Sequence, residues 1–293
     1  MRLSTTVNFF IYEDEGNYLS YYKDLEHYAE LGFSCLDCIF CSADAAFSPL
    51  RLPNYEEWAY KIREKADQLG IRFVQTHVPF YNFCDPQKGI DPDKEEIIRR
   101  SIVCTKILGA FWTVAHPGTS CGDSLIGEGS RRKNLEYFSG HLEFAKRHNV
   151  GICIENMADF PGQGYPRSYC ATVEELADLV DTLSQSWDNV GICWDFGHAN
   201  LMYGDQIPCL EYLGSRIKVT HVHDNMGKTD EHRAPFLGNI KWDEIMKALV
   251  RCGYEGDFSF EVKRLAANVP ENIKDSYWEY MKKTGGYLLS LTE

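Results

Sequence analysis

Short apolar runs alternate with amphipathic segments along the whole chain. Apolar runs bounded by turn residues indicate buried strands. In the segments between these runs, apolar residues recur every three to four positions, which indicates helices. Strands that alternate with helices pair in parallel through right-handed crossovers, so the pattern predicts a parallel α/β fold. The apolar runs end near eight positions: Phe10, Phe40, Val78, Pro117, Met157, His198, Asp224 and Val262.

Signals at the ends of the amphipathic segments support this assignment. Thr172 and Glu175 have the spacing of a capping box, and Asn54 precedes an acidic first turn. Helical spacing also covers Asp91–Leu108 and Ile240–Arg251. A glycine in the left-handed conformation commonly follows a helix, and four positions fit this role before the next strand: Gly32, Gly70, Gly109 and Gly253.

Eight strand–helix units are typical of a (β/α)8 TIM barrel, which we predict as a single domain over residues 1–293. The alternative is an open, doubly wound parallel sheet. That fold usually carries a glycine fingerprint between a strand and a helix. The glycines at 127–129 and 162–164 lack this context, so the barrel is favoured.

Chemically active side chains recur where the strand-like runs end. In TIM barrels the carboxyl ends of the strands carry the active site, and a buried carboxylate is costly unless it is paired or bound to a metal. The pattern therefore predicts a metal site at the mouth of the barrel. The residues that carry it are His77, His116, Glu155, Asp195, His198, His221 and Glu261, with Asp230 and His232 in a following loop.

Composition narrows the classes of partner. The net charge is −13, with 43 acidic against 30 basic residues, so no nucleic-acid partner is expected. The chain contains no run of about 18 apolar residues, so no membrane span is expected. Its first residues do not have the pattern of a signal peptide. The 11 cysteines are scattered, which indicates reduced thiols and a cytoplasmic protein. Cys35, Cys38 and Cys41 lack the second Cys or His pair of a zinc knuckle.

Several short motifs resemble those of the xylose-isomerase-like barrel superfamily, which contains sugar and sugar-phosphate isomerases and epimerases together with endonuclease IV. The resemblance covers essentially the whole chain. The motifs are Ile154-Glu155-Asn156, Trp194-Asp195-Phe196-Gly197-His198, Thr220-His221-Val222-His223-Asp224, Gly238-Asn239-Ile240-Lys241-Trp242 and Phe260-Glu261-Val262.

The ketose 3-epimerase branch of that superfamily implies a specific set of roles. One divalent metal would be held by Glu155, Asp195, His221 and Glu261. The two glutamates would also form the acid/base pair that moves a proton next to a sugar carbonyl, and His198 would contact the substrate. A mixed oxygen and imidazole set suits Mn²⁺, with Mg²⁺, Co²⁺ and Zn²⁺ as alternatives.

Further residues are candidates for binding a small carbohydrate. They are His77, His116, His232, Arg233 and Lys263, and the loop pair Asp230 and His232 is also a candidate for additional metal ligands. Four aromatic residues are expected on or near the top loops, at the carboxyl ends of the strands, where they could stack on a sugar or pack the loops: Phe80, Phe83, Trp112 and Phe236.

Two alternative functions stay open. The full set of nine strand-end and loop residues also matches the zinc ligands of endonuclease IV, which is a phosphodiesterase. A keto-glycoside lyase or hydrolase would use the same scaffold. The acidic balance, the short segment between His221 and Asp230 and the motif Gly238–Trp242 favour sugar chemistry. The sequence leaves a homo-oligomer open.

Overall fold

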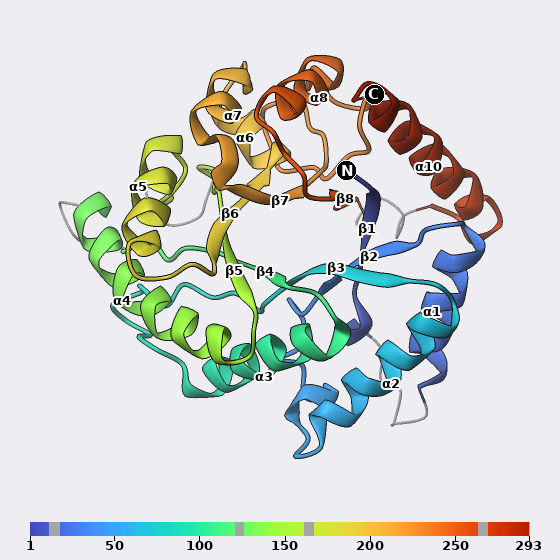
Figure 1. The fold of residues 1–293 in the computed structure, drawn as a ribbon, viewed down its shortest axis with the longest axis horizontal. Helices are drawn as coiled ribbons and strands as arrows, with labels where there is room; N and C mark the ends of the chain where they lie inside the picture. The colour runs from blue at the N-terminus through green and yellow to red at the C-terminus, as the bar shows by residue number, and fades with distance from the viewer. Residues whose placement is uncertain (12–17, 121–125, 161–166, 263–268, 293) are drawn as a thin grey trace.

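The computed structural model describes residues 1–11, 18–120, 126–160, 167–262 and 269–292. Eight parallel strands form its centre (Figure 1). Most of their residues are β-branched, aromatic or small, as expected for strands that are covered on both faces. The strands are β1 Leu3–Val7, β2 Cys35–Ile39, β3 Arg72–His77, β4 Trp112–Ala115, β5 Gly151–Glu155, β6 Val190–Asp195, β7 Ile217–His221 and β8 Phe258–Phe260.

The sheet closes on itself. Each strand pairs with its neighbours in chain order, and β8 returns to pair with β1. Between β7 and β8, the Val222 amide donates to the Ser259 carbonyl at 2.8 Å and the Glu261 amide donates to the Val222 carbonyl at 2.9 Å. These bonds complete the ring, so the predicted TIM barrel is confirmed and the open sheet is excluded.

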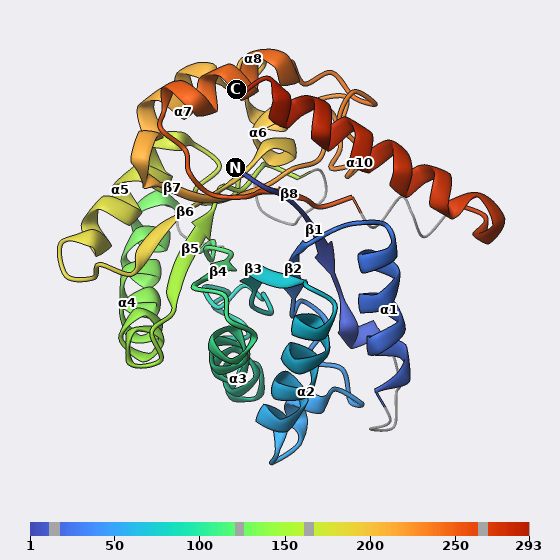
Figure 2. The same cartoon turned by 45° about the vertical axis from the view of Figure 1, so that its right-hand side comes forward.

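Helices surround this barrel (Figures 1 and 2). The C-terminal helix α10 lies against α8 and β1. The apolar face of each helix covers the strands, while the polar face meets solvent. The helices are α1 Leu19–Glu30, α2 Tyr55–Gln68, α3 Pro92–Leu108, α4 Ile126–Arg147, α5 Val173–Ser184, α6 Phe196–Met202, α7 Ile207–Leu213, α8 Trp242–Arg251 and α10 Lys274–Ser290.

The predicted helix ends agree with the structure. The Thr172 hydroxyl accepts from the Glu175 amide at the start of α5, and Asp91 caps α3 in the same way. The four predicted cap glycines all have positive φ, between 66° and 90°. Asn54 precedes α2 as predicted, but its side chain donates to the Glu57 carboxylate instead of capping the backbone.

Every strand stops one to three residues before its predicted end, and in two places the last residues of the predicted run form a helical turn instead. β1 stops at Val7, and Phe9–Ile11 forms a turn of 3₁₀ helix. β6 stops at Asp195, and the following residues begin α6. Asp195 causes this change because its carboxylate accepts from the His198 amide at 2.6 Å, which caps the helix. His198 therefore lies on the first turn of α6, directly above the end of the strand.

Alternation along the strands separates an apolar floor from a polar rim. Residues two apart on a strand point to the same face. On β5, β6 and β7 the lower inward positions are Cys153, Cys193 and Val219, which pack with Val114 and Trp112. The next inward positions, one layer nearer the carboxyl ends, are Glu155, Asp195 and His221. The floor excludes water from below, so these polar groups face only the mouth.

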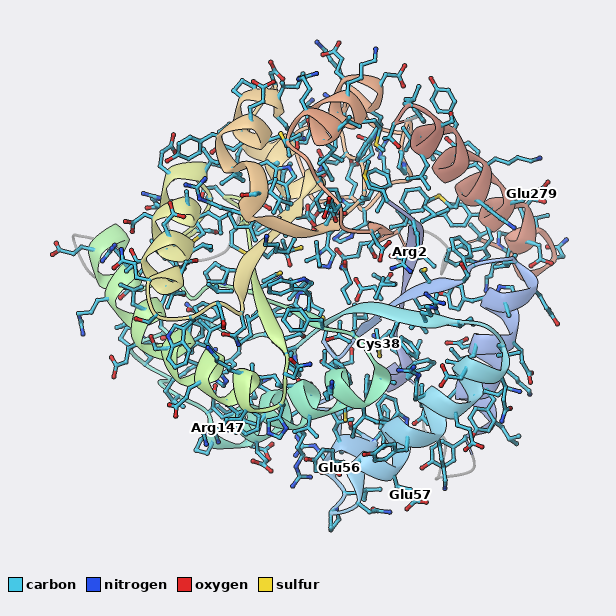
Figure 3. All side chains as sticks on the ribbon, viewed as in Figure 1. Arg2, Cys38, Glu56, Glu57, Arg147 and Glu279 are labelled. Atoms are coloured by element: carbon cyan, nitrogen blue, oxygen red, sulfur yellow. The ribbon has the colours of Figure 1, made fainter. Side chains whose placement is uncertain are left out.

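Charged side chains lie around the outside of the barrel (Figure 3). Glu56, Glu57, Arg147 and Glu279 lie on the outer rim, whereas Cys38 is buried inside. All cysteines among the described residues are free. Within the same residues, no helix is long and apolar enough to cross a membrane.

A buried carboxylate joins α3 to α4 and to the loop after β3. Glu95 accepts from the Tyr81 hydroxyl at 2.5 Å and from the Tyr137 hydroxyl at 2.9 Å. It also pairs with His141 at 2.9 Å. Burial raises the pKa of Glu95, but these hydrogen bonds outweigh it and hold the pKa below its ordinary value. The cluster fixes the loop that carries Phe80 and Tyr81 towards the barrel mouth.

We expect Glu95→Gln to lower the free energy of unfolding by about 2 kcal/mol at pH 7, since hydrogen bonds to a charged group are lost. The native pKa of Glu95 is depressed, so its stabilisation is present above the unfolded value of about 4.3 and disappears as pH falls through the native value. Urea unfolding at pH 7 and below pH 4 measures the difference. A wild-type-to-variant gap that stays constant with pH would contradict this assignment.

Candidate metal centre

Three of the four predicted metal ligands converge on a nitrogen atom of the fourth, His221. Nδ1 of His221 lies 3.3 Å from a Glu155 oxygen, 3.5 Å from a Glu261 oxygen and 4.0 Å from an Asp195 oxygen. These side chains come from the ends of β5 to β8, which the barrel brings to one mouth. Three carboxylates around one imidazole nitrogen form the mixed oxygen and nitrogen set that first-row divalent metals prefer.

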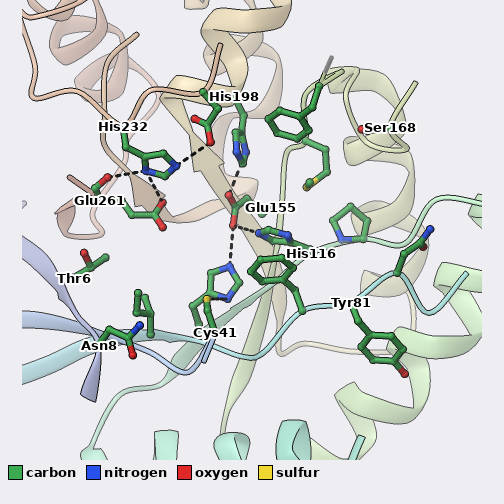
Figure 4. A pocket seen from close by; sticks show the side chains of 18 of the residues that line it. Thr6, Asn8, Cys41, Tyr81, His116, Glu155, Ser168, His198, His232 and Glu261 are labelled. Carbon is green, nitrogen blue, oxygen red and sulfur yellow. Dashed lines mark hydrogen bonds and ion pairs between the residues drawn. The ribbon is translucent and has the colours of Figure 1, made fainter. Parts of the chain in front are cut away.

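Glu155 lies at the centre of a ring of imidazoles (Figure 4). One of its oxygens lies 3.3 Å from Nε2 of His77 and 3.2 Å from Nε2 of His116. The other lies 3.3 Å from Nδ1 of His198. The side chain of Glu155 is almost fully buried, so its charge can be balanced only by these groups and by any cation that enters the mouth.

The electrostatics of these groups follow from that arrangement. Burial raises the pKa of Glu155, but His221, His116 and His198 outweigh it and hold the pKa well below its ordinary value. Burial lowers the pKa of His198, but the Asp195 and Glu155 carboxylates outweigh it and raise the pKa to about 10. Burial likewise raises the pKa of Asp195, but His198 and His223 outweigh it and lower the pKa. Glu155 and Asp195 thus stay ionised at neutral pH, which is the state that binds a cation.

His221 supports the fit of a metal to this set. It is fully buried, yet among the described residues neither of its ring nitrogens has a hydrogen-bonding partner of acceptable geometry. A buried imidazole without such a partner is unfavourable. A cation bound to Nδ1 between the three carboxylates would satisfy that nitrogen, so the residues present fit a divalent metal.

A cavity of about 800 Å³ opens above these ligands. Its lining is partly polar, with Glu155, Glu261 and the imidazoles of four histidines. It is also partly apolar, with Ile11, Phe80, Pro117, Met157 and Phe160. A concave pocket with a few convergent polar groups on an apolar wall is the usual form of a small-molecule site.

A second polar group borders the same cavity. His232 pairs with Asp230 at 2.9 Å, and its other ring nitrogen lies 2.9 Å from the Glu261 carbonyl oxygen. His223 stacks on His232, with ring centroids 4.0 Å apart, and pairs with the Asp195 carboxylate at 3.0 Å. Asp230 and His232 therefore connect to the predicted ligands through Glu261 and His223.

The remaining predicted binding residues are distributed differently. His77, His116, His198 and His232 all line the cavity. Arg233 does not line it, because its guanidinium turns back onto the Glu231 carboxylate and the Leu237 carbonyl. Lys263 lies outside the described residues.

Of the four aromatic candidates, Phe80 alone lines the cavity, where it stacks on His116 with centroids 4.5 Å apart. The placement of Trp112 near the top loops was wrong. Trp112 begins β4 and packs into the apolar floor, at the opposite end of the barrel. Phe83 is buried against Tyr137, and Phe236 contacts Tyr287 away from the mouth.

Three polar residues near the site were not among the predicted ones. The Asn156 amide group bonds both the Asp195 amide and its carbonyl, which fixes the end of β6. The Cys41 thiol lies 3.6 Å from Nδ1 of His77. Asp37 is buried in β2 beneath His221. Asp37 had a visible signal, because a carboxylate inside the apolar run Cys35–Ile39 is unusual.

A family model for xylose isomerase-like TIM barrels matches residues 25–282. The chain therefore belongs to the family of xylose isomerase-like TIM barrels. Its resemblance to this superfamily, inferred from the strand-end motifs, is confirmed.

Relatives in sequence include proteins without a described activity. The uncharacterized protein MJ1311 of Methanocaldococcus jannaschii is 28% identical over 89% of this chain and 84% of its own length. The uncharacterized protein y4fM of Sinorhizobium fredii is 35% identical, but the match spans 39% of this chain and only 33% of that protein. A probable endonuclease 4 of Staphylococcus saprophyticus is 27% identical over 56% of each chain.

Solved structures share the fold over the full length. A D-tagatose 3-epimerase-like protein has a TM-score of 0.74 at 24% identity and covers 100% of this chain and 98% of its own. A D-psicose 3-epimerase, solved in the presence of D-fructose, has a TM-score of 0.73 at 15% identity with full coverage of both chains. The IOLI protein, solved with a zinc atom, has a TM-score of 0.68 at 19% identity and covers 100% and 98%.

Proposed function

We propose that this protein is a metal-dependent sugar isomerase or epimerase that moves a proton at a carbon next to a carbonyl. The observation that carries the proposal is the approach of Glu155 and Glu261 to the same nitrogen of His221, at 3.3 and 3.5 Å, on the wall of one cavity. Glu155 and Glu261 thus belong to the proposed ligand set and at the same time line a cavity large enough for a sugar.

Glu155, Asp195, His221 and Glu261 would hold the divalent ion, with Mn²⁺ favoured. When bound, such an ion polarises a carbonyl and an adjacent hydroxyl and so acidifies the neighbouring C–H bond. Glu261 and Glu155 act as the acid/base pair that takes and returns the proton. Glu261 is the more exposed of the two, with 22% of its side chain accessible against 2% for Glu155. It therefore has freer access to a substrate.

The imidazoles at the rim position the sugar. His198, His116, His77 and His232 line the cavity and can donate to or accept from hydroxyl groups. Phe80 packs on His116 and Phe160 packs against His198 in the same lining, and such a mixture of polar groups and aromatic rings suits a sugar with its polar edge and apolar face. Arg233 and Lys263 stay candidates for a distal hydroxyl or phosphate.

Solvent deuterium tests the proposal directly. The protein, loaded with Mn²⁺, is incubated in D₂O with a panel of ketoses and keto-glycosides. We expect deuterium at one carbon next to the carbonyl of the accepted substrate. Turnover without any deuterium incorporation would contradict the proposal and would favour a hydrolase that uses the same site. Loss of the aglycone with incorporation would indicate a lyase.

The second candidate is an endonuclease IV-like phosphodiesterase. One observation favours it: Asp230 and His232, with His77 and His116, place further ligand-type groups beside the central four. The net charge of −13 opposes it, since the DNA backbone must be neutralised by basic side chains.

We therefore expect no measurable incision of duplex DNA that contains an abasic site. Nicking and gel-shift assays at low salt, with Zn²⁺ or Mn²⁺, measure this under the most permissive ionic conditions. Metal-dependent incision that Glu261→Gln abolishes would replace the sugar assignment with the nuclease one.

A further inference from the structure

A carboxylate lies inside the barrel directly below the proposed metal ligands. Asp37 occupies the middle of β2, and Gln75 is its register partner on β3. Asp37 is fully buried. Its inward direction follows from alternation, because Ile39, two residues on, lines the cavity. Asp37 thus lies one layer beneath the mouth, between the apolar floor and the ligands.

The groups around Asp37 balance its charge poorly. One oxygen, Oδ2, accepts from the Gln75 amide at 2.8 Å and from the Ser259 hydroxyl at 3.4 Å. The other oxygen, Oδ1, has no hydrogen-bond partner among the described residues. Within that part of the chain, no lysine or arginine forms an ion pair with Asp37. An ionised carboxylate so placed is costly unless a further donor compensates it.

His221 is the further donor that the geometry offers. Its Nε2 atom lies 3.5 Å from Oδ2 of Asp37, and both side chains are fully buried. The opposite nitrogen, Nδ1, faces the three carboxylates of the proposed metal centre. A neutral imidazole that gives Nδ1 to a cation must carry its proton on Nε2, and that proton then points at Asp37.

We propose that Asp37 is the positioning residue of the metal centre: it accepts the Nε2 proton of His221 and so holds Nδ1 towards the ion. Carboxylates that bind the second nitrogen of a metal-ligating histidine fix its tautomer and raise its basicity as a ligand. Gln75 and Ser259 keep Asp37 in place from β3 and β8. The inference rests on the proposed metal centre, but it does not depend on which sugar is turned over.

Asp37→Asn tests this role, because it keeps the size of the side chain and removes its charge. Titration with Co²⁺ or Mn²⁺ alone should show binding 10- to 100-fold weaker than in the wild type, about the effect of losing such a partner. The visible absorption bands of bound Co²⁺ should shift, since the imidazole is held differently. Excess Co²⁺ should restore the activity of the variant, which would not happen if Asp37 only stabilised the fold.

Glu95→Gln is the matched control. It also neutralises a buried carboxylate that pairs with a histidine, but this pair lies between α3 and α4. We expect it to lower stability and leave Co²⁺ affinity within twofold of the wild type. If Asp37→Asn also binds Co²⁺ within twofold of the wild type and its spectrum is unshifted, the proposal is overturned while the metal centre stands. A wild type that binds no divalent ion overturns both.

One measurement needs no substitution and so is safe from misfolding. The wild type is labelled with ¹⁵N-histidine and loaded with Zn²⁺. We expect a metal-bound imidazole with its ion on Nδ1 and its proton on Nε2, assigned to His221. An ion on Nε2 of His221 would leave Asp37 nothing to accept and would overturn the proposal.

Discussion

Glu261→Gln is expected to reduce solvent deuterium exchange into the substrate by 10²- to 10⁴-fold, the usual contribution of a positioned general base. The amide oxygen of glutamine can still coordinate a metal, but it cannot accept a proton at neutral pH. Bound metal should therefore persist while proton transfer is lost. The measurements are deuterium incorporation by NMR and elemental analysis of the same preparation.

The matched control for this variant is Glu279→Gln on α10. Glu279 is exposed and, among the described residues, pairs with Lys283 one helical turn away, at 2.8 Å. A surface pair of this kind contributes little, so exchange should remain within twofold of the wild type. If Glu261→Gln retained full exchange with its metal bound, Glu261 would not be the base, and Glu155 would have to supply both proton transfers.

The two glutamates differ in a way that bears on this result. The pKa of Glu155 is held well below its ordinary value by the surrounding imidazoles, which outweigh its burial. A carboxylate with so little affinity for a proton binds a cation well but is a weak base. A Glu261 carboxylate oxygen lies 3.5 Å from Nδ1 of His221 and 4.0 Å from Nδ1 of His232. Glu261 is also the more exposed of the two glutamates, so we expect it to take the greater share of proton abstraction in the proposed reaction.

Periodicity was sufficient for the fold because a parallel barrel repeats one simple unit. Each buried strand reads as a continuous apolar run, and each crossover helix has its own caps, as Thr172 and Gly109 illustrate. The same periodicity does not fix where a strand stops. Asp195 reads as part of an apolar run, yet its carboxylate binds the His198 amide and starts α6. Trp112 was placed at the wrong end of β4 for the same reason.

The convergence of the site could be anticipated because all strands of the barrel end at the same mouth. The sequence therefore predicted that four side chains would meet at this mouth, and they do lie together in the structure: Glu155, Asp195, His221 and Glu261. The position of a residue in the barrel does not determine the direction of a long side chain. Arg233 lies in the same loop as His232, but its guanidinium pairs with the Glu231 carboxylate at 2.7 Å and does not line the cavity.

Side-chain contacts between distant strands could not be predicted from the sequence. Asp37 and His221 are far apart in the chain and meet only because β2 and β7 face each other across the barrel interior. Glu95 likewise finds Tyr81, Tyr137 and His141 through the packing of α3 on α4. A single sequence marks such carboxylates as unusual, but only the folded chain identifies the groups that balance them.

Removal of a central ligand should have the largest effect on metal binding. We expect Asp195→Asn and His221→Ala each to weaken binding of Mn²⁺ by more than about 100-fold, beyond the range known for outer partners of a ligand. Asp195→Asn should still fold, because an asparagine oxygen can accept from the His198 amide at the start of α6. Activity should fall with the bound metal.

His148→Ala is the control for the histidine variant, since His148 lies at the end of α4 against Phe144, away from the mouth. Metal content is measured by elemental analysis and metal affinity by competition with a chelator. Both should match the wild type in His148→Ala and fall in Asp195→Asn and His221→Ala. Unchanged metal in both ligand variants would exclude the site that His221 and its three carboxylates form. Three zinc ions per wild-type chain would instead mean that Asp230, His232, His77 and His116 are ligands too, and the phosphodiesterase would become the better assignment.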